Sequence, residues 1–126
     1  MKSEELSHKL ARLAWEKKGD NILILDVSKL TDVTDYFVLV SAESELHVKA
    51  ISDYLQEKLE REKQKVWHRE GYQNLNWVLL DYIDVVVHIF RERTRQFYEL
   101  EKLWGDARII RVEEDAANRM VFAEEN

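Results

Sequence analysis

Two pairs of aspartates are the residues whose type suits the binding of divalent cations for phosphoryl transfer. Asp32 and Asp35 form one pair and Asp81 and Asp84 the other, and the members of each pair are three residues apart. Carboxylates that converge on metal ions from one strand are usually two residues apart, because strand side chains alternate between faces. A spacing of three points them to opposite faces. We therefore interpret all four as carboxylates of turns and sheet rims.

Other catalytic motifs are absent from the sequence. Gly19, Gly71 and Gly105 are too far apart to build a phosphate-binding loop, and no HExxH motif places two histidines at metal-binding spacing. The chain has no cysteine, which excludes disulfides, thiol nucleophiles and cysteine metal sites. We expect a protein that is not an enzyme and that has no catalytic residue, no cofactor and no metal.

The remaining residues favour binding over catalysis. His88 could be a general base, a ligand, a contact residue or a hydrogen-bonded histidine of a sheet, and the sequence leaves these alternatives open. Trp77 opens a predicted strand beside a loop, and aromatic rings with a polar rim are the usual anchors of protein interfaces. Trp15, Trp67 and Trp104 are expected to pack in the core.

The charge balance indicates the kind of partner. The 126 residues carry a formal net charge of −6 at pH 7. An acidic domain binds phosphate backbones poorly, because that affinity comes mainly from lysine and arginine. The charge instead suits a basic protein surface. We expect no direct specific binding of nucleic acid.

Residues 77–90 (WVLLDYIDVVVHIF) must position His88 and Trp77, and we predict that they form two strands joined by a tight turn. The second strand, Val85–Phe90, is β-branched and aromatic, and both of its alternating faces are largely apolar. Such a strand belongs in the middle of a sheet, because an edge strand normally exposes polar groups.

Around this hairpin we predict three helices, over residues 3–18, 44–63 and 92–104, from apolar side chains at helical spacing. The other predicted strands are residues 21–27, 36–41 and 65–69. The connection 28–35 is too short for a parallel crossover, so the first two strands should be antiparallel. The unit 36–69 should cross over between parallel strands. The order αββαβββα predicts an α/β (α+β) fold, a helix-covered mixed sheet of about five strands.

We predict that residues 1–107 form one domain and that residues 108–126 are a C-terminal extension, loosely docked or disordered. Ile109, Ile110 and Val112 could add a short edge strand to the sheet. No apolar run approaches the roughly 20 residues that span a membrane, and the N-terminus does not resemble a secretory signal. We therefore expect a cytoplasmic protein that has no contact with a membrane.

Several long blocks of the sequence, in the right order, resemble the ribosomal silencing factors, also called Iojap-like proteins. The resemblance covers residues 4–107. The matching blocks are Thr34–Val38 (TDYFV), Glu70–Tyr72 (EGY), Trp77–Tyr82 (WVLLDY), Asp84–Phe90 (DVVVHIF), Arg95–Trp104 (RQFYELEKLW) and Gly105–Ala107 (GDA). One position departs from the family, which commonly has glycine in the hairpin turn where this chain has Ile83.

The resemblance implies a nucleotidyltransferase-like fold without catalytic residues. It also implies a protein that binds the large ribosomal subunit through its ribosomal protein number fourteen. Occupying that face would block association with the small subunit and repress translation when nutrients are limiting. The alternatives are a factor for assembly of the large subunit, as in organellar relatives, or a vestigial nucleotidyltransferase-like nucleotide-binding protein.

For the contact surface we predict seven residues: Trp77, Leu79, Asp81, His88, Tyr98, Glu101 and Asp106. Trp77, Leu79 and Asp81 share one side of a strand. Tyr98 and Glu101 would share one side of a helix, although Leu79 and Tyr98 also suit the core. The apolar hairpin could alternatively serve self-association as a homodimer.

Overall fold

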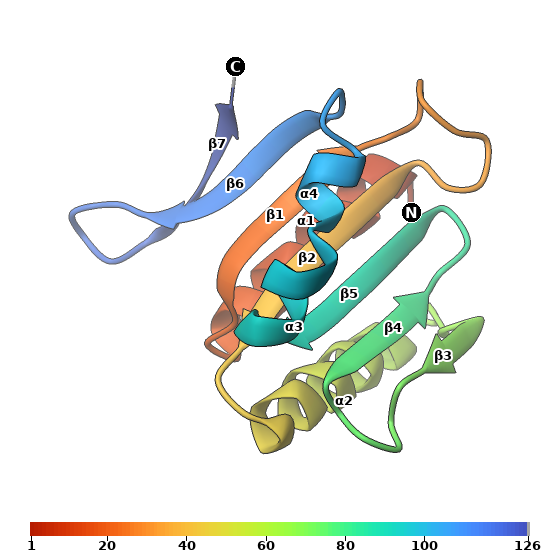
Figure 1. Ribbon diagram of the computed structural model, residues 1–126, viewed down its shortest axis with the longest axis vertical. Coiled ribbons are helices and arrows are strands. Elements are labelled where there is room, and N and C mark those ends of the chain that lie inside the picture. The colour runs from red at the N-terminus through yellow and green to blue at the C-terminus, as the bar shows by residue number, and fades with distance from the viewer. Residues whose placement is uncertain (126) are drawn as a thin grey trace.

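A computed structural model describes residues 1–125, which form a seven-stranded mixed sheet with helices on both faces (Figure 1). The strand order is β3-β4-β5-β2-β1-β6-β7, and β2 with β5 is the parallel pair. The helices are α1 (Ser3–Glu16), α2 (Glu45–Arg61), α3 (Glu92–Tyr98) and α4 (Leu100–Leu103). The strands are β1 (Asp20–Asp26), β2 (Tyr36–Ala42), β3 (His68–Glu70), β4 (Trp77–Asp81), β5 (Val85–Arg91), β6 (Arg108–Glu114) and β7 (Met120–Glu125).

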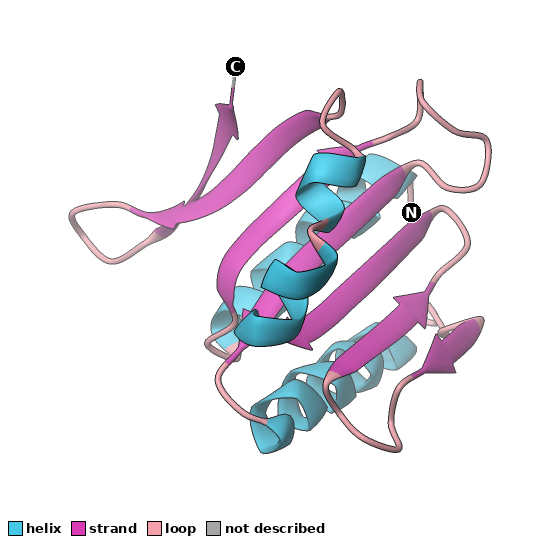
Figure 2. Cartoon of the chain, in the orientation of Figure 1, coloured by secondary structure: helices cyan, strands magenta, loops and turns pink. Residues whose placement is uncertain are grey.

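The two faces of the sheet are covered unequally (Figure 2). Helices α1 and α2 lie behind the sheet in this view and pack on the larger part of the core. The short helices α3 and α4 cross the front, where Leu100 and Trp104 pack against a smaller buried cluster that includes Leu39 and Phe90. Part of β4 and β5 on this front face is left without a helix above it.

The predicted hairpin is confirmed. β4 and β5 pair antiparallel, with Leu79 opposite His88, and β5 lies between β4 and β2. Every residue from Val85 to Phe90 is buried. The antiparallel pairing predicted for β1 and β2 is also present.

The number of strands differs from prediction, since the sheet has seven strands rather than about five. β2 and β3 run in the same direction, as the predicted crossover requires, but they are not neighbours. β2 pairs with β5, while β3 is a three-residue strand at the edge. The physical reason is side-chain character: β3 is exposed along its whole length, whereas β5 is apolar on both faces and takes the inner position. The chain therefore runs from β2 through α2 to β3 at the edge of the sheet, and it then returns through β4 to β5, which lies beside β2.

The C-terminal segment is a β-hairpin, not the loosely docked or disordered tail that we expected. β6 pairs with β1, and β7 pairs with β6. Ile110 is buried in the main core, and the ring of Phe122 contacts His8 of α1 with centroids 4.5 Å apart. The expectation failed because the segment has few apolar residues of its own. It is held by pairing with β1 and by the contact of Phe122 with α1, neither of which the local sequence shows.

The predicted helix 92–104 is interrupted at Glu99, whose backbone is left-handed with φ 47°. The break separates α3 from α4 and changes the direction in which the following side chains point. Leu100 and Trp104 face the sheet, but Phe97 and Leu103, which the helical pattern placed on the same apolar face, are exposed. A continuous helix would have kept all four on one side.

The β4–β5 turn has a positive φ of 77° at Ile83, the position where the resemblance led us to expect glycine. The N–H of Asp84 donates to the carbonyl of Tyr82 at 3.0 Å, and the N–H of Ile83 donates to Oδ1 of Asp81 at 2.7 Å. The turn geometry is therefore held by hydrogen bonds although a β-branched side chain is strained at positive φ.

We expect Ile83→Gly to raise the free energy of unfolding by about 0.5 to 1 kcal/mol. Relief of the left-handed strain gains roughly 1–2 kcal/mol, and the greater chain entropy of glycine offsets part of it. Ile83 is exposed, so little buried area is lost. Urea unfolding measures the change. Ile83→Val, which keeps the strain, is the matched control, and an equal gain in both variants would contradict this explanation.

Candidate protein-docking site

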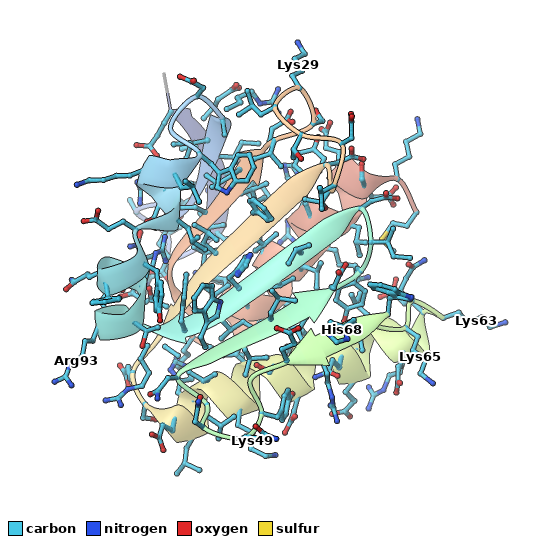
Figure 3. The ribbon with its side chains drawn as sticks, turned by 45° about the vertical axis from the view of Figure 1, so that its right-hand side comes forward. Lys29, Lys49, Lys63, Lys65, His68 and Arg93 are labelled. Carbon is cyan, nitrogen blue, oxygen red and sulfur yellow. The ribbon has the colours of Figure 1, made fainter. Side chains whose placement is uncertain are left out.

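An open groove of about 630 Å³ lies on the front face, between the loop 71–76, β4 and α3. Its lining combines large apolar and aromatic side chains with polar ones, which include Glu70, Asn74 and Arg93. The side chains that carry the argument are Trp77 and Leu79 from β4 and Phe97 and Tyr98 from α3. Arg93, labelled in Figure 3, marks the α3 edge of the groove. We call this hollow the β4–α3 groove.

Trp77 forms the floor of the β4–α3 groove and is held in one orientation. Its indole Nε1–H donates to Nδ1 of His88 at 3.0 Å. Its ring contacts Tyr98 from above and Phe90 from the neighbouring strand, with centroids 4.8 and 5.5 Å away. A half-buried ring fixed on several sides loses little entropy on binding, which suits an interface anchor.

His88 lies beneath Trp77 and is 6% exposed. Burial lowers its pKa to about 4, so the ring is neutral at physiological pH. Because Nδ1 accepts the proton of Trp77, the ring proton is assigned to Nε2, which has no hydrogen-bond partner within residues 1–125. His88 was predicted as a contact residue, but a buried ring cannot touch a partner. Its place instead matches the hydrogen-bonded sheet histidine among the alternatives, and it orients Trp77.

We expect protonation of His88 to destabilise the fold as the pH falls. The folded-state pKa of about 4 lies below the usual 6.5, so the unfolded chain binds more protons between these values. The stabilisation is therefore complete above pH 6.5, is lost progressively as the pH falls to 4, and amounts to about 3 kcal/mol.

His88→Gln is the comparison for this pH effect, because glutamine retains an acceptor for Trp77 and does not titrate in this range. Urea unfolding at several pH values measures the effect as the difference between wild type and variant. Parallel stability curves for the two proteins would contradict it.

Leu79 lines the β4–α3 groove beside Trp77, since the two side chains share one face of β4. Asp81 shares that face but lies beyond the groove lining, at the hairpin end of the strand. Its carboxylate accepts the N–H of Ile83, as a turn carboxylate does. Asp81 is half-buried.

Phe97 and Tyr98 are the aromatic residues of the groove that reach solvent, with 78% and 53% of their surface exposed. Their rings lie 5.0 Å apart, and Tyr98 continues onto Trp77. Tyr98 was predicted as a contact and lies in the groove. Phe97 was missed, because the helical pattern placed it on a buried face. No local signal marked Phe97 as exposed, because the break at Glu99 that turns it outward is not encoded in the helical pattern.

The structure does not bring Glu101 to Tyr98. The left-handed Glu99 separates them, and Glu101 turns to the opposite side of α3 and α4, toward β1. There its carboxylate pairs with Nε of Arg95 at 2.5 Å. The predicted shared helix side is therefore wrong, and Glu101 has a structural partner. Asp106 is exposed in the connection between α4 and β6, away from the groove lining.

Arg95 fastens α3 to the sheet, and sequence reasoning missed this role. It is buried, and its Nη1 donates to the hydroxyl of Ser41 at 2.9 Å and to the carbonyl of Asn21. Together with the Glu101 pair, these bonds join α3 and α4 to β1 and β2. Tyr98 and Phe97 owe their position over β4 to this attachment.

The loop 71–76 forms the opposite wall of the groove and is fixed at Gly71 and Tyr72. Gly71 has φ 95°, and a Cβ there would lie 1.9 Å from the carbonyl oxygen of Trp77. The hydroxyl of Tyr72 donates to Asp53 of α2 at 2.8 Å. Burial, with the Asp53 carboxylate second, raises the pKa of Tyr72 to about 12. The wall is therefore tied both to β4 and to α2.

The arrangement suits the binding of another protein. Within residues 1–125, no three histidine, cysteine or acidic side chains lie close enough together to hold a metal ion. In the same residues, no helix is long and apolar enough to cross a membrane. What the site offers is a preformed hollow with a fixed indole floor and two exposed aromatic rings, which is the anatomy of a protein-docking surface.

Comparison with known proteins agrees with the sequence resemblance. The family described as "Ribosomal silencing factor during starvation" matches residues 1–126. A ribosomal silencing factor of Halalkalibacterium halodurans is 34% identical over 113 residues, which are 90% of this chain and 97% of the relative. The mouse protein named "Mitochondrial assembly of ribosomal large subunit protein 1" is 32% identical over 98 residues, which are 75% of this chain and 43% of that protein.

A solved structure shares the fold. The crystal structure of a protein from Chromobacterium violaceum superposes with a TM-score of 0.81 at 34% identity, and the match covers 83% of this chain and 88% of the other.

Proposed function

This chain belongs to the family of ribosomal silencing factors, and we propose that it docks on the large ribosomal subunit through ribosomal protein number fourteen. Bound there, it blocks association with the small subunit and represses translation under nutrient limitation. Since ribosomes translate in the cytoplasm, we place its action there. The β4–α3 groove is the observation that carries this proposal.

The groove supplies the apolar part of the proposed interface. Trp77 and Tyr98 present large ring surfaces in fixed positions, and Phe97 adds a ring that packs edge-on against Tyr98 and is 78% exposed. Interface hot spots are enriched in tryptophan and tyrosine within well-packed pockets. A segment of a partner seated between the loop 71–76 and α3 would cover all three rings.

Acidic residues around the groove would attract a basic partner toward it before contact. Glu70 lies at the rim, and Asp81 and Asp106 lie farther out on the same chain, whose net charge is −6. A basic ribosomal protein would be attracted over a distance of about a Debye length, roughly 8 Å at physiological salt. The charge therefore favours encounter, while the aromatic groove provides the binding energy.

Silencing then needs no chemistry. A domain seated on the face that meets the small subunit excludes that subunit by its volume, and the block is reversed when it dissociates. The same docking site would serve a role in large-subunit assembly, for which the mouse relative is named. Self-association through the exposed rings Phe97 and Tyr98 is the competing use of this surface.

A subunit-joining experiment tests the proposal. Purified small and large subunits are mixed with and without the protein and resolved on a sucrose gradient. We expect the wild type to shift intact ribosomes to free subunits, and Trp77→Ala/Phe97→Ala to leave them intact, because the apolar anchors of the interface are gone.

Circular dichroism checks that this double variant is folded, and Leu46→Ala, an exposed apolar change on α2, is the matched control. An unchanged ribosome profile with wild-type protein would contradict silencing. Sedimentation of the protein alone tests for a dimer, which would compete for the same surface.

A further inference from the structure

We propose that residues 63–69, at the edge of the sheet, form a second contact with the large subunit, one that binds ribosomal RNA. In this contact Trp67 stacks on a base, and Lys63, Lys65 and Arg69 bind phosphates. The inference rests on the proposed docking to the large subunit and extends it from a protein partner to RNA. It departs from the expectation, drawn from the net charge of −6, that the chain makes no direct specific contact with nucleic acid. We call residues 63–69 the β3 basic segment.

Trp67 is the observation that starts the argument. It was predicted to pack in the core, but 69% of its surface is exposed. Its backbone N–H bonds the carbonyl of Asp81, which fixes the segment to the end of β4, while the indole projects outward beside His68, with ring centroids 6.0 Å apart. An indole held out at a fixed backbone position has a large stacking surface and no partner for it within residues 1–125.

The side chains of Lys63, Lys65 and Arg69, which flank Trp67 in the sequence, are basic, although the chain as a whole is acidic. Lys63 and Lys65 are exposed and make no ion pair within residues 1–125. The guanidinium of Arg69 lies 4.5 Å from the ring centre of Tyr72 and gives one N–H to Gln56, which leaves other donors at the surface. Figure 3 shows Lys63, Lys65 and His68 on the same side of the molecule, far from Lys29 and Arg93.

The nearby acids offset only part of this positive charge. Glu62 pairs with Lys9 of α1. Glu70 hydrogen-bonds the imidazole of His68 at 2.9 Å and Asp81 accepts the N–H of Ile83, and neither bond removes the negative charge of the carboxylate. The β3 basic segment therefore presents an aromatic plane with positive charges on both sides of it along the chain.

This combination favours RNA over an acidic peptide. Unpaired bases stack on aromatic side chains while lysine and arginine bind the adjacent phosphates, and this is the usual chemistry of single-stranded RNA binding. An acidic peptide would use the cations but would leave the exposed indole without a role. Unpaired bases of ribosomal RNA present both groups together.

The position of the segment fits a second contact of one docked molecule. Trp67 precedes β3, and Glu70, at its other end, lines the β4–α3 groove. Three residues of extended chain span roughly 10 Å. RNA that borders the docked ribosomal protein would therefore lie within reach of Trp67.

The test compares two partners for each variant, isolated ribosomal protein number fourteen and intact large subunits, with dissociation constants measured at several salt concentrations. The variants are Trp67→Ala and Lys63→Glu/Lys65→Glu. Lys2→Glu/Lys29→Glu makes the same charge change at exposed lysines elsewhere and is the matched control.

For intact subunits we expect Trp67→Ala to bind about tenfold more weakly. We expect Lys63→Glu/Lys65→Glu to bind about 25-fold more weakly at 0.1 M salt, with a salt slope reduced by about 1.4. Both should bind the isolated ribosomal protein as the wild type does, and the control should match the wild type with both partners.

Two outcomes overturn the RNA contact while leaving docking intact. In the first, the variants bind intact subunits as tightly as the wild type does. In the second, the variants lose affinity equally for the isolated protein, which would make the segment a protein contact that recognises acidic residues. If the wild type binds intact subunits but not the isolated protein, the proposed partner is wrong, and the intact-subunit results still decide the RNA contact. If the wild type binds neither, both proposals fail.

Discussion

Trp77→Ala should weaken binding to isolated ribosomal protein number fourteen by about 100-fold. Truncating a central interface tryptophan typically costs 2 to 4 kcal/mol, because the partner's apolar groups lose their cover and the pocket floor is removed. Trp77 is also the ring on which Tyr98 rests, 4.8 Å away, so its loss frees a second anchor. Isothermal titration calorimetry measures the change.

Three controls separate this effect from unfolding. Trp77→Phe keeps a ring against Phe90 and Tyr98 but loses the bond to His88, so we expect an intermediate loss of affinity. Trp67→Ala removes an exposed tryptophan outside the groove and should bind the isolated protein normally. Thermal unfolding shows whether each variant is folded at the assay temperature. A folded Trp77→Ala that binds like the wild type would remove the groove from the interface.

Arg95→Ala should lower the free energy of unfolding by about 3 kcal/mol. The change leaves Ser41 and the carbonyl of Asn21 without a donor and Glu101 without its cation, and breaking a buried ion pair from one side usually costs 3–5 kcal/mol. We choose the lower limit because the Glu101 side chain is half-exposed and water partly replaces its partner. Urea unfolding gives the number.

The same variant should also loosen the groove wall. Hydrogen exchange of α3 and α4 is expected to accelerate more than that of β5, because Arg95 joins these helices to β1 and β2. Arg93→Ala removes an exposed arginine from the same helix and should change stability by less than about 0.5 kcal/mol. Equal stabilities for the two variants would show that Arg95 does not fasten the helix.

Much of the fold was predictable because local chemistry decided it. The β4–β5 hairpin is apolar along β5 on both faces, and only an inner position of the sheet buries both. The second helix was predicted over residues 44–63, and α2 begins at Glu45, where the side chain of Ser44 accepts the N–H of His47. Family membership was also readable, because long blocks of the sequence carry it. The nucleotidyltransferase-like description of the fold stays a prediction.

The failures lie where the tertiary surroundings, rather than the local pattern, decided the outcome. Residues 108–125 have few apolar side chains, yet pairing with β1 and the contact of Phe122 with His8 make them strands. Glu99 adopts a left-handed backbone that no local signal required, and the break turns Phe97 outward. Trp67 was expected inside and lies outside, because a three-residue edge strand offers no second layer to cover it.

By itself, the sequence determined the family, the central hairpin and the candidate residues Trp77, Leu79 and Tyr98, since strand period and composition act over a few neighbouring residues. Only the tertiary structure decided which of the seven candidates meet. It put His88 under Trp77, turned Glu101 to a buried arginine and left Asp106 outside the groove. The physical reason is that a binding surface is made by side chains from separate elements, and their approach depends on packing across the whole sheet.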